Sequence, residues 1–112
     1  MSTPVLNRKL VLEDAVQLPD GAGGYAESWV ALGEVWAEVT AGTGREKAGE
    51  FVTVSSVPYR ILVRGAPIGA PSRPKPDQRF REGTRLFRIN AVTEQDGRAQ
   101  YLICYANEEV LS

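Results

Sequence analysis

Apolar and polar residues alternate with a period of two along most of this chain. In the segment RKLVLEDAVQL, one face carries four apolar residues interrupted by an acidic one: Leu10, Leu12, Asp14, Val16 and Leu18. Such alternation is typical of a half-buried β-strand. The following residues 19–24 contain a proline, an aspartate and three glycines. This composition predicts a flexible turn that leads into a second strand.

The second strand region contains both tryptophans of the chain, Trp29 and Trp36. We expect strand segments over residues 25–30 and 34–40, broken by Gly33. The apolar residues at 35, 37 and 39 share one face, whereas Trp36 lies on the opposite face among polar residues. Trp36 therefore needs a cover. Either a following helix or a subunit contact could provide it, since tryptophan is favoured at interfaces for its large buried area.

The segment after the second strand predicts one short helix, over about residues 44–50. Thr43 and Glu46 have the spacing of a capping box, in which each side chain satisfies an amide at the start of a helix. Gly49 indicates that this helix is brief.

A third strand is expected over residues 57–64, where apolar residues alternate with Pro58, Arg60, Leu62 and Arg64. Residues 65–77 contain four prolines and predict an extended, basic, semi-stiff loop. The remainder predicts a β-meander with strands over residues 78–81, 85–92 and 99–106 and a hairpin turn at residues 96–97. The last strand is apolar on both faces, which indicates a cover on each side.

These elements predict a mainly β fold, a small β-barrel or sandwich with one short helix and long loops. The length of 112 residues fits a single domain over residues 1–112, with the long proline-rich loop at 65–77. We expect mobile termini over residues 1–6 and 107–112. Neither a membrane-length apolar run nor the order of a signal peptide occurs, so we expect a soluble intracellular domain.

The net charge of −1 conceals an uneven distribution. Residues 60–88 hold eight basic and two acidic residues, which gives +6, and the remainder holds five basic and twelve acidic residues, which gives −7. Such a chain could pair its basic side with nucleic acid, with a neighbouring protein or with a copy of itself, or the charges could simply cover solvated strand faces.

Catalytic chemistry finds little support in the sequence. Histidine is absent, so neither Ser55-Ser56 nor Cys104 has the usual general base. The adjacent carboxylates Glu13 and Asp14 point to opposite faces of a strand and form no shared acid–base site. We therefore expect no enzyme activity, no cofactor and no metal, and we expect Cys104 to be a buried, inert thiol.

The order of segments resembles the head–tail joining proteins of tailed bacteriophages, also called head-closure or stopper proteins, and their equivalents in gene transfer agents. The resemblance covers about residues 8–105. It depends on DGAGGYAESW with Trp29, VWAEV with Trp36, GRE at 44–46, YRILVR, GTRLFRINAV and DGRAQYLICY. The loop at 65–77 is longer than is usual in the family, so its role is open: it could line or plug a channel, or contact a neighbour.

The resemblance implies a virion structural protein at the neck of a phage-like particle, made in the bacterial cytoplasm and without a membrane. Its copies would form a ring of six-fold or twelve-fold symmetry, with a portal or adaptor protein above and a tail terminator or tail tube protein below. The ring would retain packaged double-stranded DNA, let it pass through the lumen, and dock the tail. In that setting Trp29 and Trp36 would be packing or subunit-contact residues.

The basic side chains Arg73, Lys75, Arg79 and Arg81 are our candidates for contact with DNA phosphate or with an acidic partner. The alternative from another functional class is a small β-barrel module that binds single-stranded nucleic acid through residues 60–88. Such modules add stacking aromatic side chains to the positive charge, and here only Phe80 and Phe87 are near.

Overall fold

The computed structural model describes residues 4–42, 56–97 and 100–109. Six β-strands follow one another along these residues: β1 (Arg8–Pro19), β2 (Tyr25–Ala41), β3 (Ser56–Arg64), β4 (Arg79–Glu82), β5 (Arg85–Glu94) and β6 (Tyr101–Glu109). The described part contains no helix. The predicted helix over 44–50, with Thr43 and Glu46, lies outside the described residues, as do parts of both predicted mobile termini.

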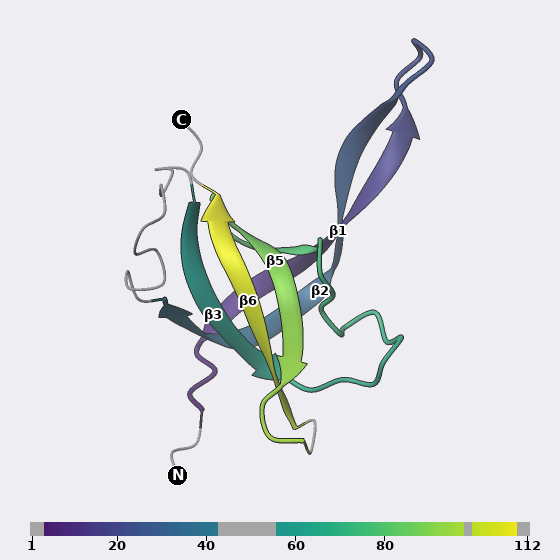
Figure 1. Cartoon of the computed structure of the whole chain (residues 1–112). Coiled ribbons are helices and arrows are strands. Elements are labelled where there is room, and N and C mark those ends of the chain that lie inside the picture. The colour runs from purple at the N-terminus through teal and green to yellow at the C-terminus, as the bar shows by residue number, and fades with distance from the viewer. Residues whose placement is uncertain (1–3, 43–55, 98–99, 110–112) are drawn as a thin grey trace.

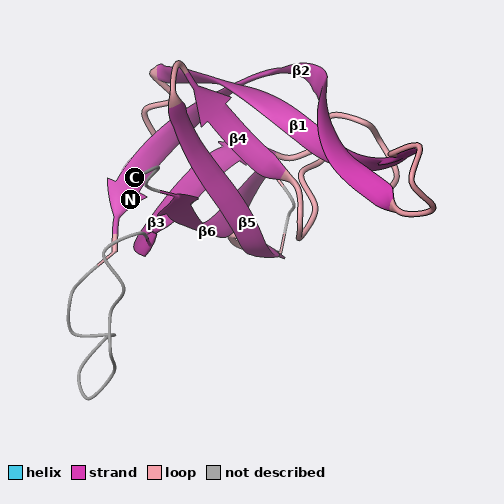
Figure 2. Cartoon of the chain, turned by 90° about the horizontal axis from the view of Figure 1, so that it is seen from above, coloured by secondary structure: helices cyan, strands magenta, loops and turns pink. Residues whose placement is uncertain are grey.

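The strands form an antiparallel sheet that closes on itself in the order β1-β2-β3-β6-β5-β4 (Figures 1 and 2). The seam between β1 and β4 is short, because only Val11, Leu12 and Glu13 pair across it. The structure thus confirms the mainly β prediction: six strands form one compact sheet, and its closure as a barrel depends on this short seam. The C-terminal boundary was predicted too early, since residues 107–109 belong to β6 and pair with both β3 and β5.

The barrel interior is filled by the inward faces that the alternation predicted. Phe80 and Phe87 are fully buried, and the ring of Tyr59 meets Phe87 edge-on at 5.2 Å between ring centroids. Such an edge-to-face pair stabilises the folded protein by about 1 kcal/mol beyond the contribution of the buried apolar area. The remaining members of the core come from the five strands other than β4: Leu10, Leu12, Ala37, Ile61, Val63, Ile89, Leu102, Cys104 and Ala106.

Two bulges shift the predicted strand faces. In β2, Leu32 is an extra residue between the pairs Leu12–Gly33 and Glu13–Ala31, so the chain continues as one strand through Gly33. Gly33 has φ of 151°, which glycine tolerates far better than other residues. In β5, Asn90 is the extra residue. Ala91 is consequently exposed, and Val92 packs against the core instead.

Beyond the β2 bulge, β1 and β2 leave the barrel as a two-stranded projection, seen at the upper right of Figure 1. We call residues 14–31 the hairpin arm. Its strands pair with each other from Asp14–Val30 to Pro19–Tyr25. Asp20 closes the tip, because its Oδ1 accepts hydrogen bonds from the amides of Ala22 (2.8 Å) and Gly24 (3.1 Å). These bonds lower the pKa of Asp20.

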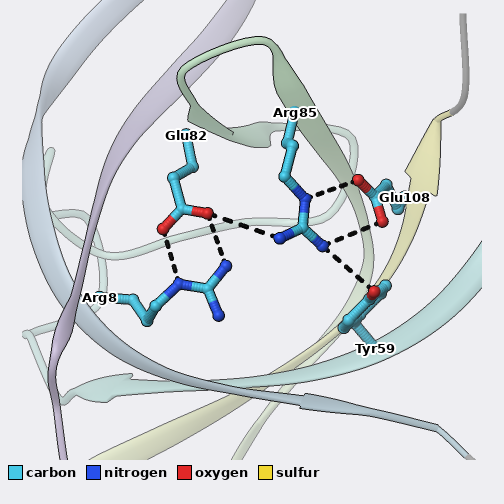
Figure 3. A network of polar contacts seen from close by, with 5 residues as sticks. All are labelled: Arg8, Tyr59, Glu82, Arg85 and Glu108. Atoms are coloured by element: carbon cyan, nitrogen blue, oxygen red, sulfur yellow. Dashed lines mark hydrogen bonds and ion pairs between the residues drawn. The ribbon is translucent and has the colours of Figure 1, made fainter.

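Polar side chains occupy one end of the barrel, on the same inward strand faces as the core (Figure 3). Arg8 donates to both carboxylate oxygens of Glu82, at 2.7 and 2.5 Å. Arg85 likewise donates to both oxygens of Glu108, at 2.8 and 3.1 Å, and to the Tyr59 hydroxyl at 3.2 Å. Arg85 also lies 3.7 Å from Glu82, which joins the two pairs into one network.

This network holds its carboxylates in the charged form. The hydrogen bond from Arg8 lowers the pKa of Glu82, and the bond from Arg85 lowers the pKa of Glu108, each against the opposing effect of burial. Because every strand except β2 contributes one of the five side chains, the network ties the strands together at an end where apolar packing stops.

Candidate functional site

The basic residues between Arg60 and Arg88 fall into two groups once the chain is folded. Four of them, on β4 and β5, form internal ion pairs: Arg79, Arg81, Arg85 and Arg88. The other four, on β3 and in the 65–77 loop, have no acidic partner among the described residues: Arg60, Arg64, Arg73 and Lys75. The second group is therefore the one whose charge is available to a partner.

Glu13 organises the base of the hairpin arm. Its two carboxylate oxygens accept hydrogen bonds from Nε of Arg79 and Nε of Arg81, each at 2.7 Å. The Glu13 side chain is only 7% exposed, and that of Arg79 16%, whereas Arg81 keeps 41% of its side chain in solvent. Burial alone would raise the pKa of Glu13, but the bonds from Arg81 and Arg79 outweigh it and lower the pKa.

Trp29 covers this cluster from the arm side. The guanidinium carbon of Arg79 lies 4.0 Å from its ring centroid, and that of Arg88 lies at 5.5 Å. Both distances fit cation–π contacts, each worth about 1 kcal/mol. Arg88 also approaches Asp77 at 3.9 Å. Trp29, predicted as a packing or subunit-contact residue, thus stacks within its own chain and fixes the direction in which the arm leaves the barrel.

The opposite face of the arm is mostly apolar, with Asp14 and Ser28 as its polar members, and no other described strand covers it. Residues paired across antiparallel strands point to the same side, so Leu18 lies beside Ala26, and Val16 beside Ser28. Val30, opposite Asp14, lies on this side too. Leu18 is 52% exposed and Val30 46%. We call Val16, Leu18, Ala26 and Val30 the arm's apolar face; by strand alternation it continues the side of β1 that carries Leu10 and Leu12 inside the barrel.

The 65–77 segment contains no strand, but it is not extended as the sequence predicted: the amide of Ala70 donates to the carbonyl of Pro67, and that of Arg73 to the carbonyl of Ala70, each at 3.0 Å. Arg73 donates from Nη1 to the carbonyl of Ala66 at 2.8 Å, which closes the first half of the loop. Pro74 is buried, and Gln78, at the end of the loop, accepts from the amide of Lys75 at 2.9 Å. Ile68, in contrast, is 86% exposed. The loop thus has an anchored base and an exposed apolar tip.

Two surface hollows lie beside the first half of this loop and share Gly65 and Ala66. One has a volume of about 230 Å³ and extends to Trp36, Arg64 and Glu34. The other, of about 380 Å³, extends to further residues of the loop and to β5: Pro67, Ile68, Arg73 and Glu94. Apolar and charged side chains therefore alternate around a concave surface that other parts of the described chain leave open.

Trp36 borders the first hollow and is 55% exposed, with Lys9 Nζ 5.9 Å from its ring centroid. The prediction that it lies on the polar face of β2 is confirmed. Its predicted cover, the helix over 44–50, is outside the described residues. A subunit contact at Trp36 stays a prediction.

The four basic residues predicted to contact a partner fall into two different environments in the structure. Arg73 and Lys75 lie in the loop without a carboxylate partner among the described residues, whereas Arg79 and Arg81 bind Glu13. The sequence analysis missed Glu13, which is 66 residues before Arg79, and it missed the exposure of Leu18 and Val30. Alternation identifies a strand face but does not say where the barrel ends.

The described residues contain no group of three or more metal-ligating His, Cys, Asp or Glu side chains, and no helix in them is long and apolar enough to cross a membrane. Cys104 is buried in the core, and burial raises the pKa of its thiol to about 12. The prediction of a buried thiol is confirmed.

Comparison with known proteins gives this architecture a context. The family described as phage head completion protein matches residues 1–109. This chain belongs to that family. A solved structure of the virion of a native gene transfer agent particle contains a chain 63% identical to this one, with a TM-score of 0.81, over 98% of this chain and all of that one.

A protein of Shigella flexneri 2a, solved in solution, shares the fold at 19% identity with a TM-score of 0.70, over the full length of both chains. No curated protein matches. The resemblance drawn from the segments around Trp29 and Trp36 is therefore confirmed at the level of the family, and the phage head completion fold here is the six-stranded barrel with its hairpin arm.

Proposed function

We propose that this phage head completion protein is a structural component of the neck of a phage-like particle, where it joins the DNA-filled head to the tail. The observation that carries the proposal is the 63% identity with a chain of a gene transfer agent virion over nearly the whole length. At that level of identity the two chains share one fold. We expect the protein in the assembled particle after its synthesis in the bacterial cytoplasm.

The structure supports an assembly role through the kind of surface it leaves open. The arm presents apolar side chains to solvent, and the loop presents Ile68 together with Arg73 and Lys75, which have no acidic partner among the described residues. Exposed apolar patches rimmed by charge are typical of protein contact sites. We propose that copies of the chain form a ring, that the ring binds an adaptor or portal protein on one side and a tail protein on the other, and that it helps to retain DNA.

The loop cations Arg73 and Lys75 are the proposed contacts with DNA or with an acidic partner. Arg79 and Arg81 already share Glu13, so their contribution to such a contact would be smaller, and Arg81, with the more exposed side chain, would contribute more than Arg79. We expect only a few of these cations to face the lumen, because each phosphate contact adds affinity and would slow the passage of DNA.

The test uses a producing bacterium in which the gene is deleted and then restored with a tagged copy. We expect tagged protein in purified particles, and in the deletion strain we expect DNA-filled heads without tails or heads that have lost their DNA. A core-destabilised variant, Phe87→Ala, serves as a control that should behave like the deletion. Normal tailed, infectious or DNA-transferring particles without the protein would refute the proposal.

The same purified chain separates the neck role from single-stranded nucleic acid binding. Phe80 and Phe87, the two aromatic residues within the basic segment 60–88, are fully buried and so not available for stacking on bases. We expect weak oligonucleotide binding at physiological salt. Tight, salt-dependent binding by the isolated chain would favour the nucleic-acid module instead.

A further inference from the structure

No other described part of the chain covers the hairpin arm on three of its sides. Its apolar face exposes Leu18 and Val30. Its two outer edges are open as well, since within the described residues the strands of the arm pair only with each other. A two-stranded ribbon is marginally stable by itself, and open edges favour pairing or covering by another chain. About six residues of each strand project beyond the barrel, which corresponds to roughly 20 Å.

The charge of the arm restricts what can cover it. No lysine or arginine occurs between Lys9 and Arg45. The arm carries Asp14, Asp20 and Glu27, none of which has a cationic partner among the described residues. A complementary surface must therefore combine exposed apolar side chains with uncompensated positive charge.

The same chain presents such a surface around the first half of the 65–77 loop. We call Trp36, Arg64, Ile68 and Arg73 the loop surface. Trp36 and Ile68 are 55% and 86% exposed, and they lie beside the two hollows that share Gly65 and Ala66. The carboxylates in those hollows are Glu34, which lies 3.8 Å from Lys9, and Glu94.

We propose that the hairpin arm of one copy lies on the loop surface of the next copy, with Leu18 and Val30 against Ile68 and Trp36. Because the two surfaces differ, this contact is head-to-tail and closes a ring when the rotation between copies allows it. The proposal rests on the proposed neck function, since it assigns the contact that would hold neighbouring copies together.

The contact can be tested by cross-linking in purified particles. We compare three tagged variants: Leu18→Cys, Ile68→Cys and the double variant. The native Cys104 is buried with a raised thiol pKa and should not react, so unmodified protein is the background control. With a short bis-maleimide linker we expect a ladder of multimers from the double variant and uncross-linked chains from each single variant.

Other cross-linking patterns overturn the proposal. Dimers from Leu18→Cys alone would mean that arms meet each other. A conjugate between Leu18→Cys and a different particle protein would assign the arm to that protein. Particles that contain the double variant but give no ladder would also reject the arm–loop contact. Absence of the protein from particles, in contrast, would be a failure of the proposed neck function itself.

Charge reversal gives an independent measurement that does not depend on cysteine placement. Asp14→Arg should weaken incorporation into particles about tenfold, because Asp14 pairs with Val30 on the arm's apolar face and the change places a positive charge opposite the loop surface. Arg64→Glu with Arg73→Glu should do the same. All three changes together should restore incorporation, and a combined variant that is no better than either parent variant would overturn the proposal.

Discussion

Replacing Glu13 by Gln tests whether the base of the hairpin arm is held by charge. The side chain of Glu13 is 7% exposed and accepts bonds from both Arg79 and Arg81 at 2.7 Å. Gln keeps the shape and one acceptor oxygen but removes the negative charge that two guanidinium groups share. The question is how much free energy of unfolding this charge supplies.

Breaking a buried ion pair by removing one partner costs about 3–5 kcal/mol. Here water screens part of the effect, because Arg81 keeps 41% of its side chain in solvent while Arg79 keeps only 16%. We therefore expect Glu13→Gln to lower the free energy of unfolding by about 2 kcal/mol at pH 7. For a domain of this size the melting temperature should fall by about 10 °C.

The pH dependence of the free energy of unfolding distinguishes a charge effect from a loss of shape or packing. The pKa of Glu13 is lower in the folded protein than in the unfolded chain, where it is about 4.3. Its stabilising contribution is thus complete above the unfolded value and is lost as the pH falls through the lower folded value. The difference between the parent protein and Glu13→Gln should be largest at neutral pH and should shrink steadily below about pH 4.3.

Equilibrium unfolding in urea, from pH 7 down to the lowest pH at which both proteins fold, measures this difference. Glu27→Gln is the matched control, because Glu27 is exposed on the arm and has no ion pair among the described residues; we expect a change below about 0.5 kcal/mol. Equal stability of Glu13→Gln and the parent at pH 7, or a difference that stays constant as the pH falls, would refute the reasoning.

Three further outcomes follow from the structure. Arg85→Ala should lower the free energy of unfolding by about 2 kcal/mol, since it removes both hydrogen bonds that Glu108 accepts from the guanidinium group, and calorimetry that finds no change would contradict this. Cys104 should resist a thiol reagent at pH 8 in the folded protein and react with one equivalent in denaturant; rapid labelling of folded protein would show that the site is open. Leu18→Ser with Val30→Ser should leave chemical denaturation nearly unchanged but reduce incorporation into particles, whereas large destabilisation would mean that the arm packs within its own chain.

The strands were predictable where a single physical rule decides them. Alternation around Ile61 and Phe87 identifies inward faces because one side of each strand must be buried, and the prolines of the 65–77 loop exclude strand pairing there. The buried position of Cys104 follows from its place on an apolar face in the same way. Each of these features is determined by residues that are close together in the sequence.

The site depended on information that is not local. Glu13 meets Arg79 and Arg81 only because β1 and β4 close the barrel. The bulge at Leu32 and the end of the β1–β4 seam decide that the strand faces of the arm lie outside the core, although the alternation through Leu18 continues unchanged. A periodic pattern reports which side of a strand is apolar, and only the topology reports what covers that side.

The most direct test of the neck assignment is an image of the intact particle at a resolution that separates β-strands. We predict that the six-stranded barrel fits a ring of repeated density at the junction of head and tail, with each hairpin arm lying on the neighbouring copy beside its 65–77 loop. A junction whose density fits no copy of this barrel, in particles that contain the protein, would contradict the account.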